Sequence, residues 1–351
     1  MERNGLRIKA AFDCIWRKDR VKHKASAEWF PFLALAALVF FTATESMAGT
    51  ELKKASFIPQ WSPQAQFAGY YVAYEKGFYR QHGIDLKIIQ GGPERTPTEY
   101  LKKGGADFAT TWLSTAIELR SRGERIVNIG QIIQRSALML IARKSDGILS
   151  PSDLEGKKVG IWGGDFSIQP RAFLRKYGLK VKIVPQSFSV NLFLRGGVDA
   201  TSAMWYNEYH TIINSGVDPE ELTTFFFDAY GLNFPEDGIY ASEKLCMRDP
   251  ELCSAFLKAS LQGWDYAFSH QEEALDIVMK YMSAAKIPAS RIHQKWMLMR
   301  MKDIIMTVRS MPGVLDMKDY ETVCRELQKS GLIKKPPEFT SFYRGRQADA
   351  Q

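Results

Sequence analysis

Tryptophan, carboxamide and carboxylate side chains gather at four places in the sequence where a predicted β-strand ends. These segments are residues 60–66, 112–114, 163–167 and 205–208. Three of them contain a tryptophan, and Trp162 immediately precedes the fourth. An aromatic ring offers a flat ligand a stacking surface, while amide and carboxyl groups orient the ligand through hydrogen bonds. The pattern predicts a binding site for a small, flat, polar molecule, although any one of these tryptophans could equally cap a hydrophobic core.

Charged and glycine-rich segments near these strand ends offer two further chemistries. Glu236 and Asp237 could accept hydrogen bonds from ligand N–H groups, or could simply belong to a solvated turn. The glycine pairs at 91–92 and 163–164 each precede a predicted helix, where backbone N–H groups can hold an anion. Arg171 could add positive charge to such a site. Paired glycines in a strand-to-helix turn usually serve geometry alone, so the anion interpretation is the weaker one.

Motifs for covalent, acid–base or metal chemistry are missing from the sequence. There is no G-x-S-x-G nucleophile elbow, no H-E-x-x-H zinc motif and no P-loop lysine. The five histidines are scattered, and His210, the one nearest to a predicted site segment, lies in no acid–base constellation. The cysteines form no cluster of metal ligands. We therefore expect a protein that is not an enzyme, with no catalytic residue, no metal site and no cofactor.

The charge of the chain does not point to nucleic acid. The 351 residues carry a formal net charge of +8, but residues 1–48 hold eight basic and five acidic side chains and so supply +3 of it. The remaining positive charge is scattered, without a basic helix that carries interleaved aromatic residues. With 45% apolar and 25% charged residues, the chain has the composition of a globular protein of roughly two domains.

The first 48 residues have the pattern of a signal peptide. A basic stretch ends at Lys24, a mostly apolar run follows at 29–41, and the small residues Ser46 and Ala48 stand where a signal peptidase would cut. We expect cleavage after Ala48 and export to the periplasm. An uncleaved anchor helix is the alternative, but the run is shorter than the ~20 residues that a membrane span needs.

Export changes the interpretation of the cysteines. Cleavage would leave Cys246, Cys253 and Cys324, an odd number. The first two flank Asp249-Pro250, a helix-start signal that could bring them within bonding reach. A disulfide between Cys246 and Cys253 and three buried thiols remain equally open at this point.

The elements that must position these side chains follow a βα pattern. Short predicted strands alternate with helices, which is typical of βαβ units and a largely parallel sheet. Residues 101–110 align with residues 193–202, and each copy is followed by an aromatic loop, at 112–114 and 205–207. This repetition predicts two α/β lobes of related design.

The breaks in the pattern predict how the lobes are assembled. We place lobe I at residues 49–142 and 240–351 and lobe II at residues 143–239, so that two crossovers form a hinge. The tail after residue 249 has helical periodicity and is assigned to lobe I. Ligands of open α/β sheets bind beyond the carboxyl ends of the strands. We therefore expect the site in a cleft between the lobes.

Several of these segments resemble a known family. The stretch at 61–73, with Glu75-Lys76-Gly77-Phe78-Tyr79 after it, is similar to ABC-transporter solute-binding proteins of the thiamine-pyrimidine-precursor, sulfonate and nitrate type. Matching segments at 153–160, 205–209 and 230–238 extend the resemblance over roughly residues 55–300. It implies a two-lobed, type II periplasmic-binding-protein fold. Each lobe would be a mainly parallel sheet flanked by helices, with the cleft between the lobes.

The resemblance also implies a function and a set of contacts. It predicts a monomeric substrate-binding component of an ABC importer, which captures a small heteroaromatic ligand by hinge closure and delivers it to a membrane permease. A binder of sulfonate-type anions is the alternative. A fungal pyrimidine synthase of the same branch uses a cysteine-rich motif, its own histidine and a lysine-bound pyridoxal phosphate, but this chain has no cysteine cluster. The ligand contacts carried over by position, with Gly163 added from the glycine turn, are Trp61, Gln66, Trp112, Gly163, Trp205, Asn207, Glu208 and Asp237.

Overall fold

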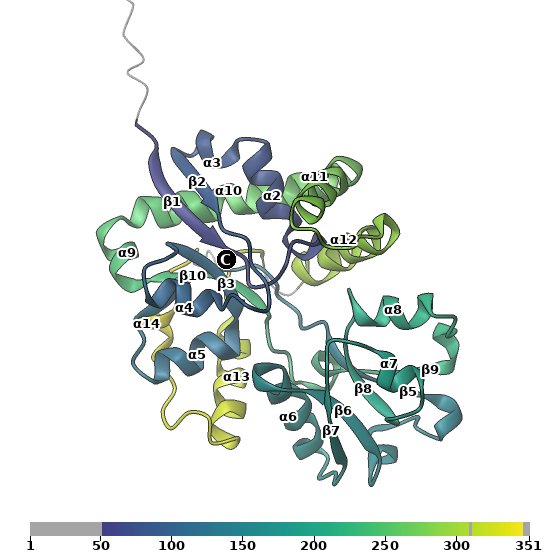
Figure 1. Ribbon diagram of the computed structural model, residues 1–351. Helices are drawn as coiled ribbons and strands as arrows, with labels where there is room; N and C mark the ends of the chain where they lie inside the picture. The colour runs from purple at the N-terminus through teal and green to yellow at the C-terminus, as the bar shows by residue number, and fades with distance from the viewer. Residues whose placement is uncertain (1–50, 309–310, 347–351) are drawn as a thin grey trace, which may run out of the picture. The chain divides into compact units, whose positions relative to one another are not determined.

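The computed structural model of the chain describes residues 51–308 and 311–346. The predicted signal peptide at 1–48 lies outside these residues. Within the described ranges, no helix has both the length and the hydropathy needed to cross a membrane. Two five-stranded sheets form the framework of the described part (Figure 1).

The first sheet combines strands from both ends of the described chain. Its order is β2 (Ile84–Ile88), β1 (Lys53–Ile58), β3 (Phe108–Trp112), β10 (Asp237–Ser242) and β4 (Ile126–Gln131). Strand β1 runs parallel to β2 and β3, whereas β10 is antiparallel to β3 and β4.

The second sheet repeats this plan with strands from the middle of the chain. Its order is β7 (Lys182–Gln186), β6 (Lys158–Trp162), β8 (Ala200–Met204), β5 (Leu138–Arg143) and β9 (Leu222–Phe226). Strand β6 is parallel to β7 and β8, and β5 is antiparallel to β8 and β9. In each sheet four strands share one direction, and the antiparallel strand is the one that enters from the other sheet. The predicted α/β class with mainly parallel sheets is confirmed.

The crossovers lie a few residues away from the predicted boundaries. Strand β5 pairs with β8 and β9, so residues 138–142 belong to the second sheet and not to lobe I, where the sequence placed them. Strand β10 begins at Asp237 in the first sheet, three residues before the predicted return to lobe I. Strand β5 is apolar from Leu138 to Ala142, and such a run gives no signal of which sheet it will join. Strand β10 begins with Asp237-Gly238, a pair that is typical of a turn.

The duplicated segment has the same place in both sheets. Residues 101–110 link helix α4 (Pro97–Lys102) to β3, and residues 193–202 link helix α7 (Asn191–Leu194) to β8. Gly104 and Gly196 both take a left-handed backbone conformation, with φ of 68° and 71°, which glycine adopts without strain. Strands β3 and β8 are both third in their sheet, so the predicted correspondence is confirmed.

Helices cover both faces of the first sheet (Figure 1). Side chains alternate between the two faces of a strand, and here both sets are buried, so each face packs against helices. Phe57 and Phe108 face one core and Ile58 and Ala109 face another. The first core is closed by α2 (Ala68–Glu75), α3 (Phe78–Gln81), α9 (Glu243–Arg248), α10 (Pro250–Ser269) and α11 (Gln271–Ala284). The second is closed by α4, α5 (Leu113–Ser121), α13 (Met317–Lys329) and α14 (Phe339–Phe342).

The second sheet is also covered on both faces. Leu138 and Leu140 face α6 (Ile168–Lys176), while Met139 and Ile141 face α7 and α8 (Glu208–Asn214). Helix α12 (Arg291–Ile305) contacts both α8 and the short turn η1 (Ala65–Phe67). The other 3-10 turns are η2 (Lys144–Asp146), η3 (Pro151–Leu154), η4 (Gly164–Ser167), η5 (Pro219–Glu221) and η6 (Phe227–Tyr230).

The disulfide that the sequence left open is present. Cys246 at the end of α9 bonds to Cys253 in α10, across a Cα–Cα distance of 5.8 Å. Cys324 is a free, buried thiol in α13.

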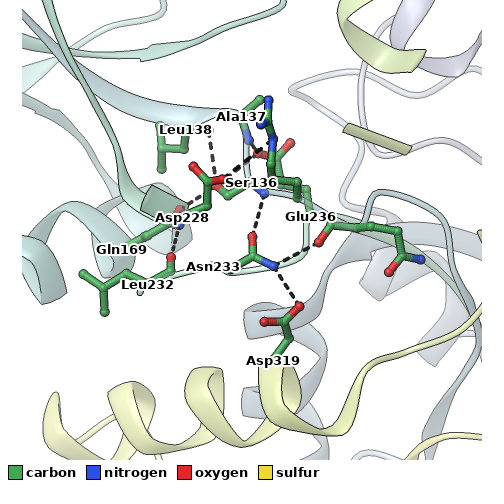
Figure 2. A network of polar contacts seen from close by, with 11 residues as sticks. Ser136, Ala137, Leu138, Gln169, Asp228, Leu232, Asn233, Glu236 and Asp319 are labelled. Carbon is green, nitrogen blue, oxygen red and sulfur yellow. Dashed lines mark hydrogen bonds and ion pairs between the residues drawn. The ribbon is translucent and has the colours of Figure 1, made fainter. Parts of the chain in front are cut away.

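Buried polar side chains tie the two crossovers together (Figure 2). Asn233 accepts a hydrogen bond from the backbone N–H of Ser136 at 2.9 Å and donates to Asp319 at 2.8 Å. The carboxylate of Glu236 accepts from the backbone N–H of Ala137 at 2.5 Å. These bonds fix the entering and returning segments against each other, so both strand crossovers are held at one place.

Candidate functional site

A cavity of about 200 Å³ lies where strands of both sheets end. The residues that line it lie at the ends of β3, β6 and β8 or in the segments that follow β1, β6, β7 and β8. The lining consists of Gln60, Trp61, Gln64, Gln66, Trp112, Trp162, Phe166, Phe188, Met204, Tyr206, Asn207 and Glu208. This is the location at which an α/β sheet binds its ligand, because the strand-to-helix loops converge there.

Aromatic rings form most of the walls and meet in edge-to-face pairs. The rings of Trp61 and Phe188 have their centroids 5.0 Å apart at an interplanar angle of 66°. Phe166 stands edge-on to Trp112, at 4.7 Å, and to Trp162, at 5.8 Å. Trp61 and Trp112 stand at the ends of first-sheet strands, whereas Trp162, Phe166 and Phe188 stand at the ends of second-sheet strands. The cavity is therefore bounded by flat apolar surfaces suited to a planar ligand.

The loop after β1 is held in place by close backbone packing and by hydrogen bonds. A Cβ atom on Gly91 would come within 2.1 Å of the Pro59 carbonyl oxygen and 2.4 Å of the Trp61 carbonyl oxygen, so only glycine fits there. Helix α12 supports the other end of the loop. Gln294 accepts from the Ala65 N–H at 2.8 Å, and the Met297 sulfur accepts from the Gln66 N–H at 3.2 Å. These contacts set the position of Trp61 and Gln66.

The polar side chains of the cavity are already oriented by one another. Gln66 donates from Nε2 to Asp237 Oδ2 at 2.9 Å and accepts at Oε1 from Gln64 Nε2 at 2.6 Å. Asn207 donates from Nδ2 to Glu208 Oε1 at 2.8 Å, and the Met204 N–H donates to Glu208 Oε2 at 3.0 Å. Side chains fixed in this way lose little conformational entropy when a ligand binds.

Three buried carboxyl groups lie at this end of the molecule. Burial raises the pKa of Glu208 to about 7 and the pKa of Asp237 to about 7. Burial raises the pKa of Glu236 to about 8, and the neighbouring Asp237 adds to the effect. Burial, reinforced by these carboxyl groups, also holds the pKa of Tyr206 well above its usual value. Near neutral pH, Glu208 can therefore accept a hydrogen bond as a carboxylate, or donate one as an acid.

Cationic side chains are missing from this cavity. Of the residues that the structure describes, no Lys, Arg or His lines it. Arg171, the sequence candidate for binding an anion, is an exposed residue of α6 outside the lining. Gly163 is also exposed and outside the lining, and Gly91 serves loop packing as described above. The described residues also contain no group of three His, Cys, Asp or Glu side chains arranged to hold a metal ion.

Trp205 lies away from the cavity. The guanidinium groups of Arg135 and Arg300 both lie over its ring, 5.1 Å and 4.7 Å from the ring centroid. Phe226 packs edge-on at 5.5 Å, and the backbone carbonyl of Trp205 accepts from Trp296 Nε1 at 3.0 Å. The side chain fastens the end of β8 to the first crossover and to α12, which is a structural role.

The predicted contacts thus divide into two groups. The structure brings Trp61, Gln66, Trp112, Asn207 and Glu208 into one lining. Asp237 stands behind Gln66 as its hydrogen-bond acceptor, and Gly163 and Trp205 do not reach the cavity.

Further lining residues were outside the predicted set. Gln60, Gln64, Phe166 and Tyr206 fall inside the segments that the sequence marked, and alternation along an extended segment could have singled out Tyr206. Phe188 follows β7, a strand end that the sequence did not mark. Its side chain is 60% exposed, and only the structure shows that it belongs to the lining.

A larger hollow of about 670 Å³ lies elsewhere, over β4, α9 and α10. Its lining is mainly apolar, includes the disulfide cysteines and contains no strand end of the second sheet. Convergent polar groups mark a binding site better than volume does, so the smaller cavity is the stronger candidate.

Comparison with known proteins gives one family, with relatives that are named as binding proteins and as synthases. A family model described as "NMT1/THI5 like" matches residues 64–274. The formylaminopyrimidine-binding protein of Halalkalibacterium halodurans is 21% identical over 313 residues, which is 86% of this chain and 94% of that protein. The 4-amino-5-hydroxymethyl-2-methylpyrimidine phosphate synthase of Legionella pneumophila is 24% identical over 258 residues, covering 69% and 78%.

Solved structures share the architecture. The periplasmic aliphatic sulphonate binding protein of Escherichia coli superposes with a TM-score of 0.64 at 16% identity. The match covers 83% of this chain and 97% of that one. The periplasmic-binding-protein fold that the sequence predicted is confirmed.

Proposed function

The chain belongs to the NMT1/THI5-like family, and from that premise we propose that it binds a small, flat, nitrogen-rich heteroaromatic molecule of the thiamine-pyrimidine-precursor kind. The protein would act in the periplasm as the monomeric substrate-binding component of an ABC importer. The two sheets, as two lobes, would close on the ligand, and a membrane permease would receive it.

One observation carries this proposal: the cavity has aromatic walls and amide and carboxyl groups, but no cationic side chain from the described residues. Stacking on an aromatic ring contributes about 1–3 kcal/mol per base in other proteins and tolerates any planar ring. Glu208 and the amides can then pair with ring nitrogens and amino groups. The volume of about 200 Å³ lies below the roughly 300–1,000 Å³ of sites for drug-sized ligands, which favours a ligand of one small ring system.

The anion-binding alternative has less support from the side chains. A sulfonate or nitrate would need positive charge or several backbone N–H donors. Arg171 is exposed outside the lining, and Gly91 packs against backbone carbonyl oxygens. An ionised Glu208 in the lining would also repel an anion. The name of the formylaminopyrimidine-binding relative fits the heteroaromatic proposal instead.

The synthase alternative is motivated by the name of the Legionella pneumophila relative. The resemblance implies that such synthases consume a histidine and hold pyridoxal phosphate on a lysine. Of the described residues, neither Lys, His nor Cys lines the cavity. A lining without a lysine does not fit a cofactor that is held as a Schiff base, so we favour binding over synthesis.

Calorimetry with a small panel tests the proposal. The panel contains formylaminopyrimidine, 4-amino-5-hydroxymethyl-2-methylpyrimidine, an alkanesulfonate and nitrate. We expect the pyrimidines to bind and to raise Tm; a hundredfold excess over Kd would add about 2.7 kcal/mol to the free energy of unfolding. Arg171→Ala should leave pyrimidine affinity unchanged.

Binding of the anions alone, abolished by Arg171→Ala, would replace the proposal with the anion alternative. The intact mass of the native protein tests the synthase alternative in the same preparation, because a lysine-bound cofactor would add a fixed mass.

A further inference from the structure

A directed chain of hydrogen bonds runs from the cavity to helix α12. Asn207, in the lining, has its Oδ1 2.8 Å from His293 Nε2, and His293 Nδ1 lies 2.8 Å from His210 Nδ1. The His210 ring is stacked on Trp296, with centroids 4.9 Å apart at an interplanar angle of 15°. Neither histidine lines the cavity, yet together they connect its Asn207 to α12.

The chemistry of the partners fixes the direction of every bond in this chain. An ionised Glu208 can only accept, so Asn207 must point its Nδ2 toward the carboxylate, 2.8 Å away, and its Oδ1 toward His293. His293 must then donate from Nε2, which leaves Nδ1 of a neutral ring as an acceptor. His210 must therefore donate from Nδ1 to His293. Asn214 Nδ2 lies 3.1 Å from His210 Nδ1 and 3.4 Å from His210 Nε2. Because Nδ1 carries the hydrogen in this order, Nε2 is the atom to which Asn214 donates.

This order determines what Asn207 offers a ligand. One Nδ2 hydrogen is used by Glu208, and the second is left for the cavity beside the carboxylate. The lining thus presents a donor next to an acceptor. That pair is complementary to a ring nitrogen adjacent to an amino group, and it mismatches a ring N–H adjacent to a carbonyl.

We propose that His293, oriented by His210, is a positioning residue that holds the Asn207 amide in the orientation required to distinguish an aminopyrimidine edge from an oxo edge. The proposal rests on the proposed function for the ligand class, but the hydrogen-bond directions can be tested without any ligand. Without His293, the Asn207 Oδ1 loses its hydrogen-bond donor, so the Glu208 carboxylate alone holds the amide and the second Nδ2 hydrogen is aimed less firmly at the ligand.

The pair tolerates one proton but not two. A single added proton still leaves one acceptor at the Nδ1–Nδ1 contact, whereas two protons place two donors face to face at 2.8 Å. Burial lowers the pKa of His210, and burial together with the charge of His210 lowers the pKa of His293. Both histidines therefore carry an added proton only at pH values below the ordinary histidine pKa of about 6.5.

The other ionisable groups on α8 are Glu208 and Tyr209, and those on residues 291–300 of α12 are Arg291, Lys295 and Arg300. Arg291 pairs with Glu272 and Asp276 of α11, Lys295 pairs with Glu272, and Arg300 pairs with Asp303. Most of the positive charge near the histidines is therefore already compensated.

The first experiment compares two ligands in four proteins by calorimetry at pH 8. The ligands are 4-amino-5-hydroxymethyl-2-methylpyrimidine and its 4-oxo counterpart, and the proteins are wild type, His293→Ala, His293→Gln and His82→Gln. His82 is half-buried, lies 3.2 Å from Gln262 Oε1 and controls for the loss of an imidazole. We expect His293→Ala to bind the aminopyrimidine roughly tenfold more weakly, the value of one hydrogen bond to a polar ligand group. It should also reduce the preference for the amino over the oxo ligand.

His293→Gln should retain both affinity and preference, because its amide N–H can replace Nε2–H. In wild type, affinity should decline below about pH 6, where both histidines become protonated. His293→Gln should not show this decline, but it should keep the separate titration of Glu208 near pH 7. His82→Gln should match wild type throughout. A His293→Ala protein that is less stable but keeps the full amino preference would overturn the proposal.

Nitrogen-15 NMR of the imidazole rings tests the directions in the free protein. At pH 8, His293 should be the Nε2–H tautomer and His210 the Nδ1–H tautomer. The opposite tautomer at His293 would overturn the proposal even if the pyrimidines bind. If no pyrimidine binds, the proposed function fails, and the tautomers still decide whether His293 holds the Asn207 amide as described.

Discussion

The carboxyl ends of β3 and β8 occupy the same place in two sheets of the same topology, yet their tryptophans have different roles. Trp112 ends β3 and lines the cavity, with 5% of its surface exposed. Trp205 follows the last residue of β8 and packs against Arg135 and Arg300, outside the cavity. In the duplicated segments the residue equivalent to Trp112 is Met204, which does line the cavity.

One residue of register decides which side chains at a strand end reach the cavity. Side chains alternate between opposite faces along a strand, so a shift by one residue moves a ring from the cavity to the other side. The sequence interpretation paired the aromatic loops at 112–114 and 205–207, one residue out of register with the aligned segments before them. The prediction that Trp205 stacks on the ligand was therefore wrong, because its ring lies on the other face, while Tyr206, the next residue, reaches the lining.

The two strand ends also differ in chemistry. The end of β3 supplies an aromatic wall, and the end of β8 supplies the amide and carboxyl groups of Asn207 and Glu208. If this division is correct, substitutions at the two ends should separate stacking, recognition and stability.

The largest effect is expected for Trp112→Ala. Truncating a buried tryptophan costs about 3–5 kcal/mol of stability, and the loss of a stacking wall should weaken a planar ligand by about 1–3 kcal/mol. Trp112→Phe should recover most of both, since it keeps a ring. Chemical denaturation and calorimetry measure the two quantities separately, and unchanged affinity in a folded Trp112→Ala protein would remove Trp112 from the site.

The acid at the end of β8 should give stability and affinity opposite dependences on pH. Burial raises the pKa of Glu208 from 4.5 to about 7, so between these values the folded state holds a proton that the unfolded state lacks. This contribution to stability is complete in acid and is lost as pH rises through about 7, by at most about 3 kcal/mol for a shift of this size.

Affinity for an amino group should instead increase over the same range, because the carboxylate is a stronger hydrogen-bond acceptor than the protonated carboxyl group. Glu208→Gln should flatten both profiles, whereas Glu236→Gln, outside the lining, should change only the stability profile. Thermal melts and titrations from pH 5.5 to 8.5 test this. Equal effects of the two substitutions on affinity would contradict the division between them.

Trp205→Ala should destabilise the protein without changing affinity. It removes two cation–π contacts of about 0.5–2 kcal/mol each together with the packing on Phe226. We expect a loss of roughly 2–4 kcal/mol in the free energy of unfolding. Heteroaromatic affinity measured well below Tm should stay within about twofold of wild type, or about 0.4 kcal/mol. A tenfold loss would return Trp205 to the ligand.

The smallest effects are expected at two glycines from the turns that the sequence marked as possible anion sites. Gly91→Ala would drive a Cβ into the loop that carries Trp61, and overpacking of this kind costs typically about 1–3 kcal/mol. Gly163→Ala meets no atom within 4 Å and has an ordinary φ of −76°, so it should be neutral. Stability and affinity measured for both variants test the loop's role. A neutral Gly91→Ala would show that the loop can move freely.

Much of the fold could be predicted because local patterns specify it. Alternating strands and helices gave the α/β class, and the repeated helix–glycine–strand segment gave two related units. The sheets that β5 and β10 join could not be predicted, because pairing partners far away in the sequence decide them. For the site, the strand-end rule located most of the lining, whereas Phe188 and the supporting His293 depend on contacts between remote segments.

The amino-acid sequence by itself determined the class of the fold, the strand ends at which a ligand would bind and the aromatic and amide character of the site. These properties depend on residue type and on periodicity over a few residues. Only the tertiary structure decided that Met204 and Tyr206 face the cavity while Trp205 does not, that Asp237 acts through Gln66, and that α12 supports both Gln66 and Asn207. Those outcomes depend on strand register and on packing between distant segments, which local sequence patterns do not encode.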